Sequence, residues 1–381
     1  MKTRLLTHPA YPCLNSIIVA LAFVLLVMAS GCNEPRWTTY RADAYSQGQL
    51  SAGGGVFVGA VAWTFPTGGQ VWSTPVFSKD GTTAYFGSCD NKIYAVDSSN
   101  GQKKAEFTTG GCVYGLLIAN DIVYATSADG NLYVLDAALN LKWKFGAGPS
   151  IRTAPMLYGT RVYFTTDVDL LYSVDINHHN PVWVVRTFGP VSSTPAAWVG
   201  GDGMVILGDA NNNVTAYDDN DGRVVWRFRT GAGVSAAPAV DTATGRVFIG
   251  SFDKKMYSLD ANTGAKVWEF NADGYITSAA VVQGGNVYFA TDGGTFFGLD
   301  RNMNKLWDPP ALVESVTGSP ILNVSTGLFF LRAYRSLYLL NPSARRRAVV
   351  FTAGGVISDP SLGPNGLVVF GSWDGRVYAM R

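Results

Sequence analysis

The chain has 381 residues, of which 47% are hydrophobic, 13% aromatic and 15% charged, and its formal net charge is +1. This length and composition allow a large buried core, and 43 glycines are typical of a turn-rich β protein. A charge so close to zero excludes a global field that would attract nucleic acid. Residue types that perform catalysis are scarce, with three histidines and four glutamates in the whole chain.

The N-terminus has the pattern of a targeting segment. Lys2 and Arg4 precede an apolar run of 13 residues at 17–29. A bilayer span takes about 20 residues, so this run is typical of a signal-peptide core. The letters ASGC, which end at Cys32, resemble the bacterial lipobox, with Ala29 where that motif usually has Leu.

We therefore predict a lipoprotein-type signal at 1–31, lipidation of Cys32 and a flexible linker up to residue 57. An uncleaved anchor and an ordinary secretory signal are the alternatives. Two or more acyl chains hold a protein stably on a membrane. By the sorting rule of Gram-negative lipoproteins, Asn33 directs the protein to the outer membrane.

A short strand-like motif of the form YAVD recurs eight times along the rest of the chain. Its copies end at Asp97, Asp136, Asp175, Asp218, Asp260, Asp300, Asn341 and Arg381, with steps of 39 to 43 residues. Each unit holds four short alternating segments that are separated by turn residues. A tryptophan stands in most fourth segments, at Trp63, Trp143, Trp183, Trp226, Trp268 and Trp307, and Ala105 and Val349 take the other two places.

Four-stranded units with a period near 40 are typical of propeller blades. The last unit, 358–381, has only three segments, and the first tryptophan segment, 61–69, has no three segments before it. We predict an all-β, eight-bladed β-propeller of four-stranded blades over 58–381. Its N-terminal strand should close the last blade as the outermost strand, which removes the open edge. An open solenoid is the alternative, and the two incomplete ends argue against it.

The units resemble the quinoprotein-type, or PQQ-like, propeller repeat. Residues 73–97 and 251–270 fit that repeat well, and residues 37–48 resemble the leader that precedes it. The resemblance implies one of two functional classes. One is the quinoprotein dehydrogenases, which hold PQQ and Ca²⁺, and the other is the non-catalytic lipoproteins of the BamB type, which are scaffolds of outer-membrane β-barrel assembly.

The dehydrogenase class implies an acidic base, oxygen ligands for Ca²⁺ and long insertions. This chain has no adjacent cysteine pair, and eight units of about 40 residues leave no long loop for a cofactor lid. His178 and His179, and the acidic stretch at 218–222, are interpreted as solvated turns rather than metal sites. We predict no catalytic residue, no metal and no cofactor, with PQQ and Ca²⁺ as the alternative.

In a propeller, the turns between second and third strands and the crossovers between blades share one face. We expect residues on this face to bind a protein partner, because exposed aromatic and cationic groups are enriched in interface hot spots. Several aspartates of these turns are expected to cap the turns. The candidates are Trp72 and Arg152 at the channel mouth, Asp90 in a turn, and Arg332, Arg335 and Trp373 beside it.

Cys89 and Cys112 should lie on the same face in neighbouring blades, as a disulfide or as two free thiols. The crossovers at 187–195 and 230–238 are short, and they lack the Leu/Arg-rich and acidic features through which BamB-type scaffolds contact their barrel partner.

The sequence as a whole favours a non-enzymatic, membrane-tethered scaffold or binding lipoprotein of the bacterial envelope. It would face the periplasm from the outer membrane or be exported to the surface. Its first candidate partner is an outer-membrane β-barrel assembly component, and no nucleic acid is expected. A PQQ-dependent oxidoreductase and a surface carbohydrate or peptide binder are the alternatives.

Overall fold

The computed structural model describes residues 49–50, 59–201, 203–308, 315–341, 346–351 and 354–381. The chain divides into two units, Met1–Glu34 and Pro35–Arg381, and every described residue belongs to the second. The predicted signal, the lipid site at Cys32 and most of the predicted linker lie outside the described residues. In the part that is described, no helix has the length and apolar character to cross a membrane.

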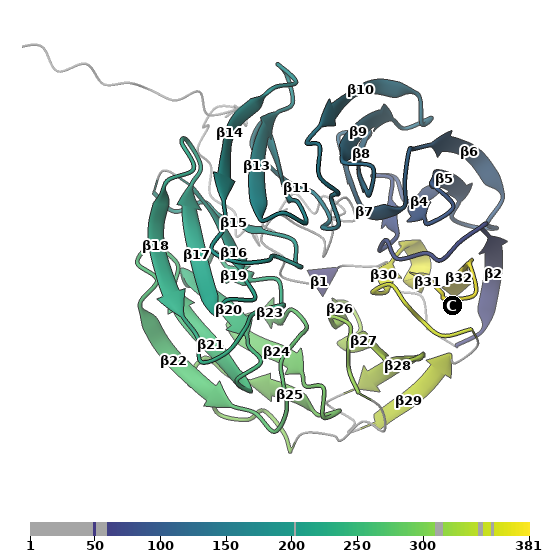
Figure 1. Cartoon of the computed structure of the whole chain (residues 1–381). Coiled ribbons are helices and arrows are strands. Elements are labelled where there is room, and N and C mark those ends of the chain that lie inside the picture. Colours follow the sequence, from purple (N-terminus) through teal and green to yellow (C-terminus); the bar gives the residue numbers. More distant parts are fainter. Residues whose placement is uncertain (1–48, 51–58, 202, 309–314, 342–345, 352–353) are drawn as a thin grey trace, which may run out of the picture. The chain divides into compact units, whose positions relative to one another are not determined.

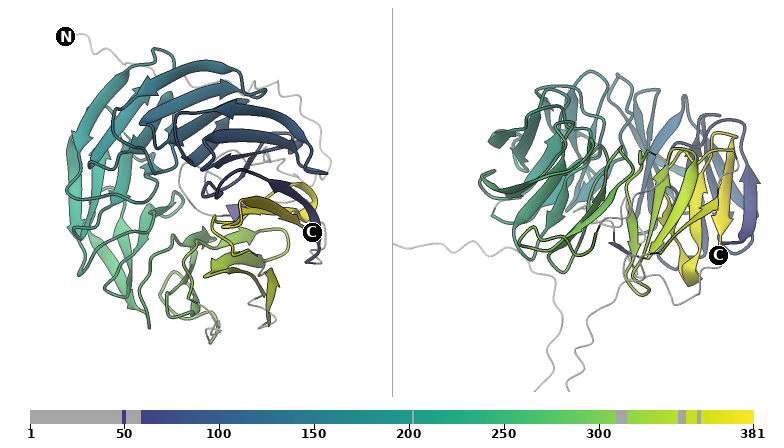
Figure 2. Two further views of the ribbon diagram at one scale, coloured as in Figure 1. Left: turned by 45° about the vertical axis from the view of Figure 1, so that its right-hand side comes forward. Right: turned by 90° about the horizontal axis from the view of Figure 1, so that it is seen from below.

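Eight β-sheets follow one another around a ring and form an eight-bladed β-propeller (Figures 1 and 2). From the innermost strand outwards, blade 1 contains β3 (Val76–Phe77), β4 (Thr83–Ser88), β5 (Lys92–Asp97) and β6 (Lys103–Thr108). Blade 2 contains β7 (Val113–Ala119), β8 (Ile122–Ser127), β9 (Asn131–Asp136) and β10 (Leu141–Gly146). Blade 3 contains β11 (Met156–Tyr158), β12 (Arg161–Thr165), β13 (Leu170–Asp175) and β14 (Pro181–Arg186).

The ring continues in the same order. Blade 4 contains β15 (Ala196–Trp198), β16 (Met204–Gly208), β17 (Asn213–Asp218) and β18 (Val224–Arg229), and blade 5 contains β19 (Ala239–Asp241), β20 (Arg246–Gly250), β21 (Lys255–Asp260) and β22 (Lys266–Asn271). Blade 6 contains β23 (Val281–Gln283), β24 (Asn286–Ala290) and β25 (Phe296–Leu299). Blade 7 contains β26 (Ile321–Asn323), β27 (Leu328–Ala333), β28 (Ser336–Asn341) and β29 (Arg346–Phe351), with β1 (Gln49–Leu50) beside β26.

Blade 8 closes the ring, as predicted. It contains β30 (Ser361–Leu362), β31 (Val368–Gly371), β32 (Arg376–Met380) and, outermost, β2 (Val61–Pro66), and the short 3-10 turn η2 (Pro364–Gly366) joins β30 to β31. β2 pairs antiparallel with β32. The N–H of Ala60 donates to the carbonyl of Arg381 over 2.9 Å, and the N–H of Arg381 donates back over 3.0 Å. The N-terminal strand therefore removes the free edge of the last blade.

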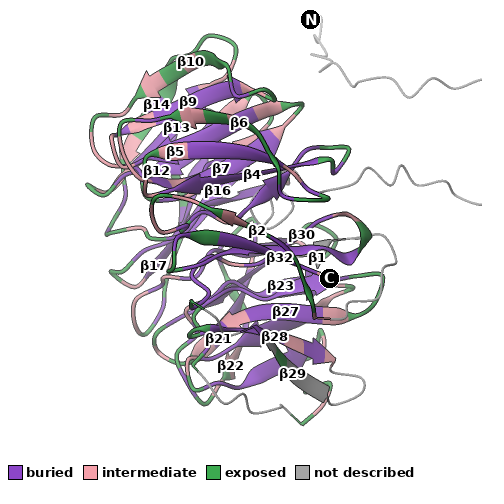
Figure 3. Cartoon of the chain, turned by 90° about the vertical axis from the view of Figure 1, so that its right-hand side faces the viewer, coloured by how far each residue is buried: buried purple, intermediate pink, exposed green. Residues whose placement is uncertain are grey.

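The burial of each strand follows from its place in the blade (Figure 3). The third strand β5 is buried at all four central positions, because neighbouring blades cover both of its faces. The outer strand β18 is instead mostly exposed and buries Trp226 between exposed neighbours. A single four-stranded sheet cannot bury both faces, so each blade depends on the blades beside it.

Blade 6 departs from the predicted four strands. After β25 only an isolated bridge joins Leu299 to Lys305. Trp307 nevertheless packs on the blade, with its ring stacked 5.8 Å from Tyr288. The sequence that follows is Asp308 and then two prolines, which have no N–H to donate to a neighbouring strand. The tryptophan thus keeps its packing position without a regular fourth strand.

Blade 7 gains an unexpected strand at the centre of the ring (Figure 1). Gln49 and Leu50, which fall in the predicted linker, pair in parallel with Leu322 and Asn323 of β26. This pairing covers the inner edge of blade 7, which would otherwise present unpaired backbone groups to the channel.

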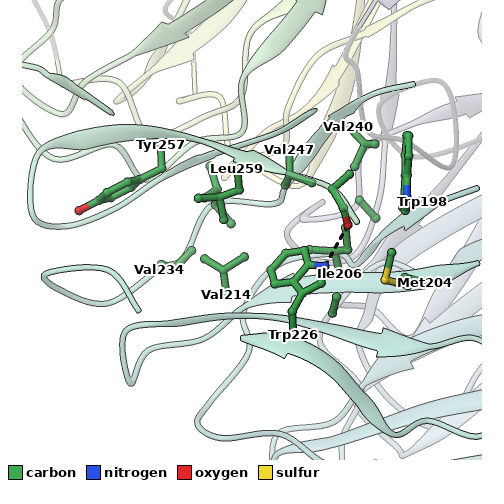
Figure 4. Packing of buried hydrophobic residues seen from close by; sticks show 14 residues of the cluster. Trp198, Met204, Ile206, Val214, Trp226, Val234, Val240, Val247, Tyr257 and Leu259 are labelled. Carbon is green, nitrogen blue, oxygen red and sulfur yellow. Dashed lines mark hydrogen bonds between the residues drawn. The ribbon is translucent and has the colours of Figure 1, made fainter. Parts of the chain in front are cut away.

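A tryptophan dock joins neighbouring blades (Figure 4). Trp226 on β18 of blade 4 is 7% exposed, and its indole N–H donates over 2.9 Å to the carbonyl of Ala261 in blade 5. In the same turn Gly264 has φ +69°, and a Cβ there would lie 2.5 Å from the Trp226 ring, so the ring requires glycine. The same contacts recur for Trp63 with Ser98 and Gly101, and for Trp183 with Asp219 and Gly222.

We expect Trp226→Phe to lower the free energy of unfolding by about 1–2 kcal/mol, because it keeps a ring but removes the donor to Ala261. Trp226→Ala should cost about 3–5 kcal/mol, because it also opens a cavity between two blades. Chemical denaturation of the purified protein measures both values. The control is Val224→Ala on the exposed side of β18, which should change stability by less than about 0.5 kcal/mol. If Trp226→Phe and Val224→Ala lowered the free energy of unfolding equally, the indole hydrogen bond would not contribute to stability.

Candidate partner-binding face

Exposed aromatic residues gather on one side of the propeller. We call this side the crossover face, since it carries the crossovers between blades and the turns between second and third strands, and we call the other side the opposite face. Every Phe, Tyr and Trp that is exposed within the described residues lies on the crossover face, namely Trp72, Phe188, Phe252, Tyr275, Tyr334 and Trp373. Contiguous exposed apolar groups mark an interaction surface, and two pairs of these rings are in contact, Trp72 with Trp373 and Phe252 with Tyr275.

Three of the predicted residues form one cluster on this face. The rings of Trp72 and Trp373 meet edge to face with centroids 5.0 Å apart, although they come from the crossover into blade 1 and from a turn of blade 8. A Cβ on Gly355 would lie 3.1 Å from Trp373 and 3.4 Å from Arg335, so both side chains lie against this glycine. Trp72 and Trp373 are 38% and 42% exposed. The cluster offers a partner two indole surfaces beside a guanidinium group.

The channel mouth brings a second group together. A cavity of about 190 Å³ lies there, and Trp72, Arg152 and Arg332 are among the residues that line it. The guanidinium of Arg152 lies 5.5 Å from the ring centroid of Tyr114. Trp72 belongs to both groups, so the aromatic cluster continues to the channel mouth.

Arg332 is less exposed than the sequence predicted. The sequence placed it among exposed cations, but its side chain is only 18% exposed. Its Nε lies 3.8 Å from Oδ1 of Asp359, and its Nη2 donates to the carbonyl of Thr317 over 3.0 Å. Arg332 therefore links blades 7 and 8 and offers little free charge to a partner.

Asp90 also has a structural task. Its Oδ2 accepts from the N–H of Gly68 and from the hydroxyl of Tyr94, both over 2.7 Å, and its Oδ1 accepts from the N–H of Lys92 over 3.1 Å. The turn capping that the sequence predicted is present. The same arrangement recurs at Asp129 and Asp253, and in part at Asp374. The carboxylate of Asp90 therefore holds its own turn and the preceding crossover in place.

The sequence analysis did not predict two further groups of aromatic contacts on the crossover face. Phe252 and Tyr275 meet edge to face at 5.8 Å, with the ammonium of Lys254 5.6 Å from the Tyr275 ring. The guanidinium of Arg227 lies 4.4 Å from the ring of Phe188. A signal for Phe252 existed, since it stands between Ser251 and Asp253 just as Trp373 stands between Ser372 and Asp374. Cation–aromatic pairs thus extend around the crossover face.

We expect Asp129→Asn to lower stability at pH 7 by about 1–2 kcal/mol, because a carboxylate that accepts several hydrogen bonds is lost. Burial raises the pKa of Asp129, but hydrogen bonds from Tyr133, Ser127 and the N–H of Asn131 outweigh burial and hold this pKa below its usual value. The stabilisation is thus present above the unfolded pKa, near 4, and is lost as pH falls through the lower folded pKa. Denaturation of both proteins between pH 7 and 2 measures this. A difference that grows as the pH falls would contradict the assignment.

Cys89 and Cys112 are joined in the structure by a disulfide, with their Cα atoms 4.0 Å apart. Cys89 follows β4 in blade 1, and Cys112 directly precedes β7 in blade 2. The bond therefore connects two neighbouring blades on the crossover face, next to the aromatic cluster.

Reduction should lower the free energy of unfolding by about 2–4 kcal/mol, because the bond closes a loop of moderate length. Alkylation of the unreduced, unfolded protein followed by mass spectrometry should leave both sulfurs unlabelled. The double variant Cys89→Ser, Cys112→Ser should show no effect of reductant. Labelling of both cysteines before reduction would show that they are free thiols.

The channel mouth does not fit PQQ with Ca²⁺. Its cavity of about 190 Å³ is smaller than the about 300–1,000 Å³ of typical ligand sites. Among the described residues that line it, Asp359 is the one carboxylate, and it lies against Arg332. Elsewhere in the described part, no three His, Cys, Asp or Glu side chains gather closely enough to hold a metal ion.

The turns that hold histidines and aspartates lie on the opposite face. His178 contacts Oδ1 of Asp175 over 3.0 Å, and His179 stacks on Trp143 at 4.5 Å in the place where other docks have glycine. In the acidic stretch, Asp218 accepts from Arg223 over 2.8 Å. His178 and Asp218 therefore stabilise turns, and His179 packs in a dock between two blades.

A family model described as outer membrane protein assembly factor BamB matches residues 140–242 and 210–354. Together these ranges run from 140 to 354 and cover more than half of the chain. The chain belongs to this family. Its fold is the PQQ-like propeller that the repeat resembles. No curated protein matches the chain.

Two solved structures share the fold. BamB from Moraxella catarrhalis superposes with a TM-score of 0.70 at 16% identity, over 84% of this chain and 99% of that one. The computationally designed Ika8 protein superposes with a TM-score of 0.72, also at 16% identity and with the same coverage of both chains. At this identity the likeness establishes the fold.

Proposed function

We propose that this protein is a non-enzymatic, membrane-tethered scaffold of the bacterial envelope that holds a protein partner on its crossover face. One observation carries the proposal: all exposed Phe, Tyr and Trp residues of the described part lie on that face. Aromatic and arginine side chains dominate the hot spots of protein interfaces.

The shape of the surface favours a protein over a small ligand. The exposed rings come from turns of blades 5, 7 and 8 and from the crossovers into blades 1, 4 and 6, rather than from one cleft. The cavity at the channel mouth is only about 190 Å³. A broad partner can contact such dispersed side chains together, whereas a small molecule cannot.

Membership of the BamB family supports a component of outer-membrane β-barrel assembly as the partner. The crossovers at 187–195 and 230–238 are short in this chain. We therefore place the main contact at Trp72, Trp373 and Arg335, in blades 7 and 8 and the crossover into blade 1.

The test is affinity isolation of the tagged full-length protein from crosslinked, detergent-solubilised membranes of its own host, with mass spectrometry. We expect an outer-membrane β-barrel assembly protein to be recovered. The triple variant Trp72→Ala, Arg152→Ala, Arg335→Ala should reduce this recovery at least tenfold, because it removes an indole and two cations from the interface.

A matched control carries Val199→Ala, Arg301→Ala and Lys305→Ala, on or beside turns of the opposite face, and should bind as the unmodified protein does. Both variants should unfold at the denaturant concentration of the unmodified protein, which separates loss of binding from loss of fold. Equal recovery with the crossover-face variant would refute this assignment of the interface.

A further inference from the structure

The dock between blades 1 and 2 lacks its tryptophan. On β6, Ala105 pairs with Ala95 of the third strand. In blade 4 the equivalent register pairs Trp226 with Ala216. Ala105 therefore stands where an indole ring would otherwise pack on the next blade.

The neighbouring turn of blade 2 is altered to match. The N–H of Asp136 donates to the carbonyl of Asn140, so this turn is one residue shorter than that between Asp260 and Ala265. Leu139, with φ +63°, takes the place of the dock glycine and is only 3% exposed. Leu139 belongs to the same apolar cluster as Ala105 and so fills the inner part of the space.

An open cavity of about 830 Å³ remains outside Leu139, which is within the about 300–1,000 Å³ of typical ligand sites. We call it the vacant dock. It opens between blades 1 and 2 on the opposite face, because the turns that line it all lie there. Its lining includes Lys79, Tyr85, Lys104, Ala105, Asp121 and Ala138.

The chemistry of the lining fits an aromatic ring that carries a donor. Ala105 and Ala138 supply apolar surface, and the buried Tyr85 lies behind them. The carbonyl of Ala137 corresponds to the one that accepts from the indole in other docks. Here it accepts from the hydroxyl of Tyr85 over 2.9 Å, and its second lone pair can accept another donor. The ammonium of Lys104 donates to the carbonyl of Thr82 over 2.9 Å and holds a cation at the rim.

We propose that the vacant dock binds a tryptophan side chain of a partner protein. Three other docks of this chain indicate which side chain fits. In each of them an indole ring packs against the equivalent turn and its N–H donates to the equivalent carbonyl. The site is separate from the crossover face and does not depend on the function proposed for that face.

The chain has ten tryptophans, and Trp37 is the one outside the described residues. The variant Trp37→Phe in the experiment below therefore separates the chain's own tryptophan from one that a partner supplies.

The test uses ligand-observed ¹⁹F NMR with N-acetyl-5-fluorotryptophanamide and the full-length protein. We expect saturable binding with a Kd on the order of 0.1–1 mM, as for a small ligand of this size. Unlabelled N-acetyltryptophanamide should compete, and N-acetylleucinamide should not. Ala105→Trp supplies the missing ring from within and should weaken binding at least tenfold. The matched control is Val349→Trp at the equivalent place in blade 7, which should leave binding unchanged.

Ala138→Arg gives a second test if Ala105→Trp does not fold, because Ala138 is exposed in a turn and its replacement obstructs the dock from outside. It should also weaken binding at least tenfold. Absence of saturable binding to the unmodified protein, or equal binding to the folded Ala105→Trp or Ala138→Arg variant, overturns the proposal. Binding that emerges only with Trp37→Phe also overturns it, since the chain's own tryptophan would then be the occupant.

Discussion

The contact between a tryptophan of one blade and the turn of the next is the interaction on which this propeller depends. A four-stranded sheet has two apolar faces and can cover neither alone. The dock of Trp226 on Ala261 and Gly264 joins two such sheets through apolar packing and one directed hydrogen bond. The same dock forms with Trp63 and Trp183, and the pairing of β2 with β32 closes the ring without a free edge.

Residues that recur in every unit stabilise the fold, whereas residues that differ from the repeat can bind a partner. Residues that recur in the repeat hold the fold together: Asp90 accepts hydrogen bonds from Lys92 and Tyr94 of its own blade and from Gly68 in the crossover from blade 8. The proposed binding residues are ones that depart from the repeat. Trp72 and Trp373 stand at places of the repeat whose residue varies from unit to unit, and their rings meet on the crossover face at 5.0 Å. Ala105 replaces a dock tryptophan and leaves a cavity of about 830 Å³.

The two proposed sites therefore occupy different faces and have different physical origins. The crossover face gains exposed rings and cations, which suit a broad protein interface. On the opposite face the junction beside Ala105 lacks its ring, and an open cavity of about 830 Å³ remains there. A scaffold built this way can engage a membrane-held partner on one side and a second protein on the other.

By itself, the sequence determined the eight blades, the place of the dock tryptophans and the closure by the N-terminal strand, because period, alternation and turn residues are local features. It also located Trp72, Arg152, Arg335 and Trp373 on one face, since position in the repeat determines the face. Tertiary structure alone decided which polar groups are free: Arg332 resembles an exposed turn cation until Asp359, from the next blade, lies beside it. It also decided the pairing of β1 with β26 and the cavity beside Ala105, because both depend on contacts between segments that are far apart in the chain.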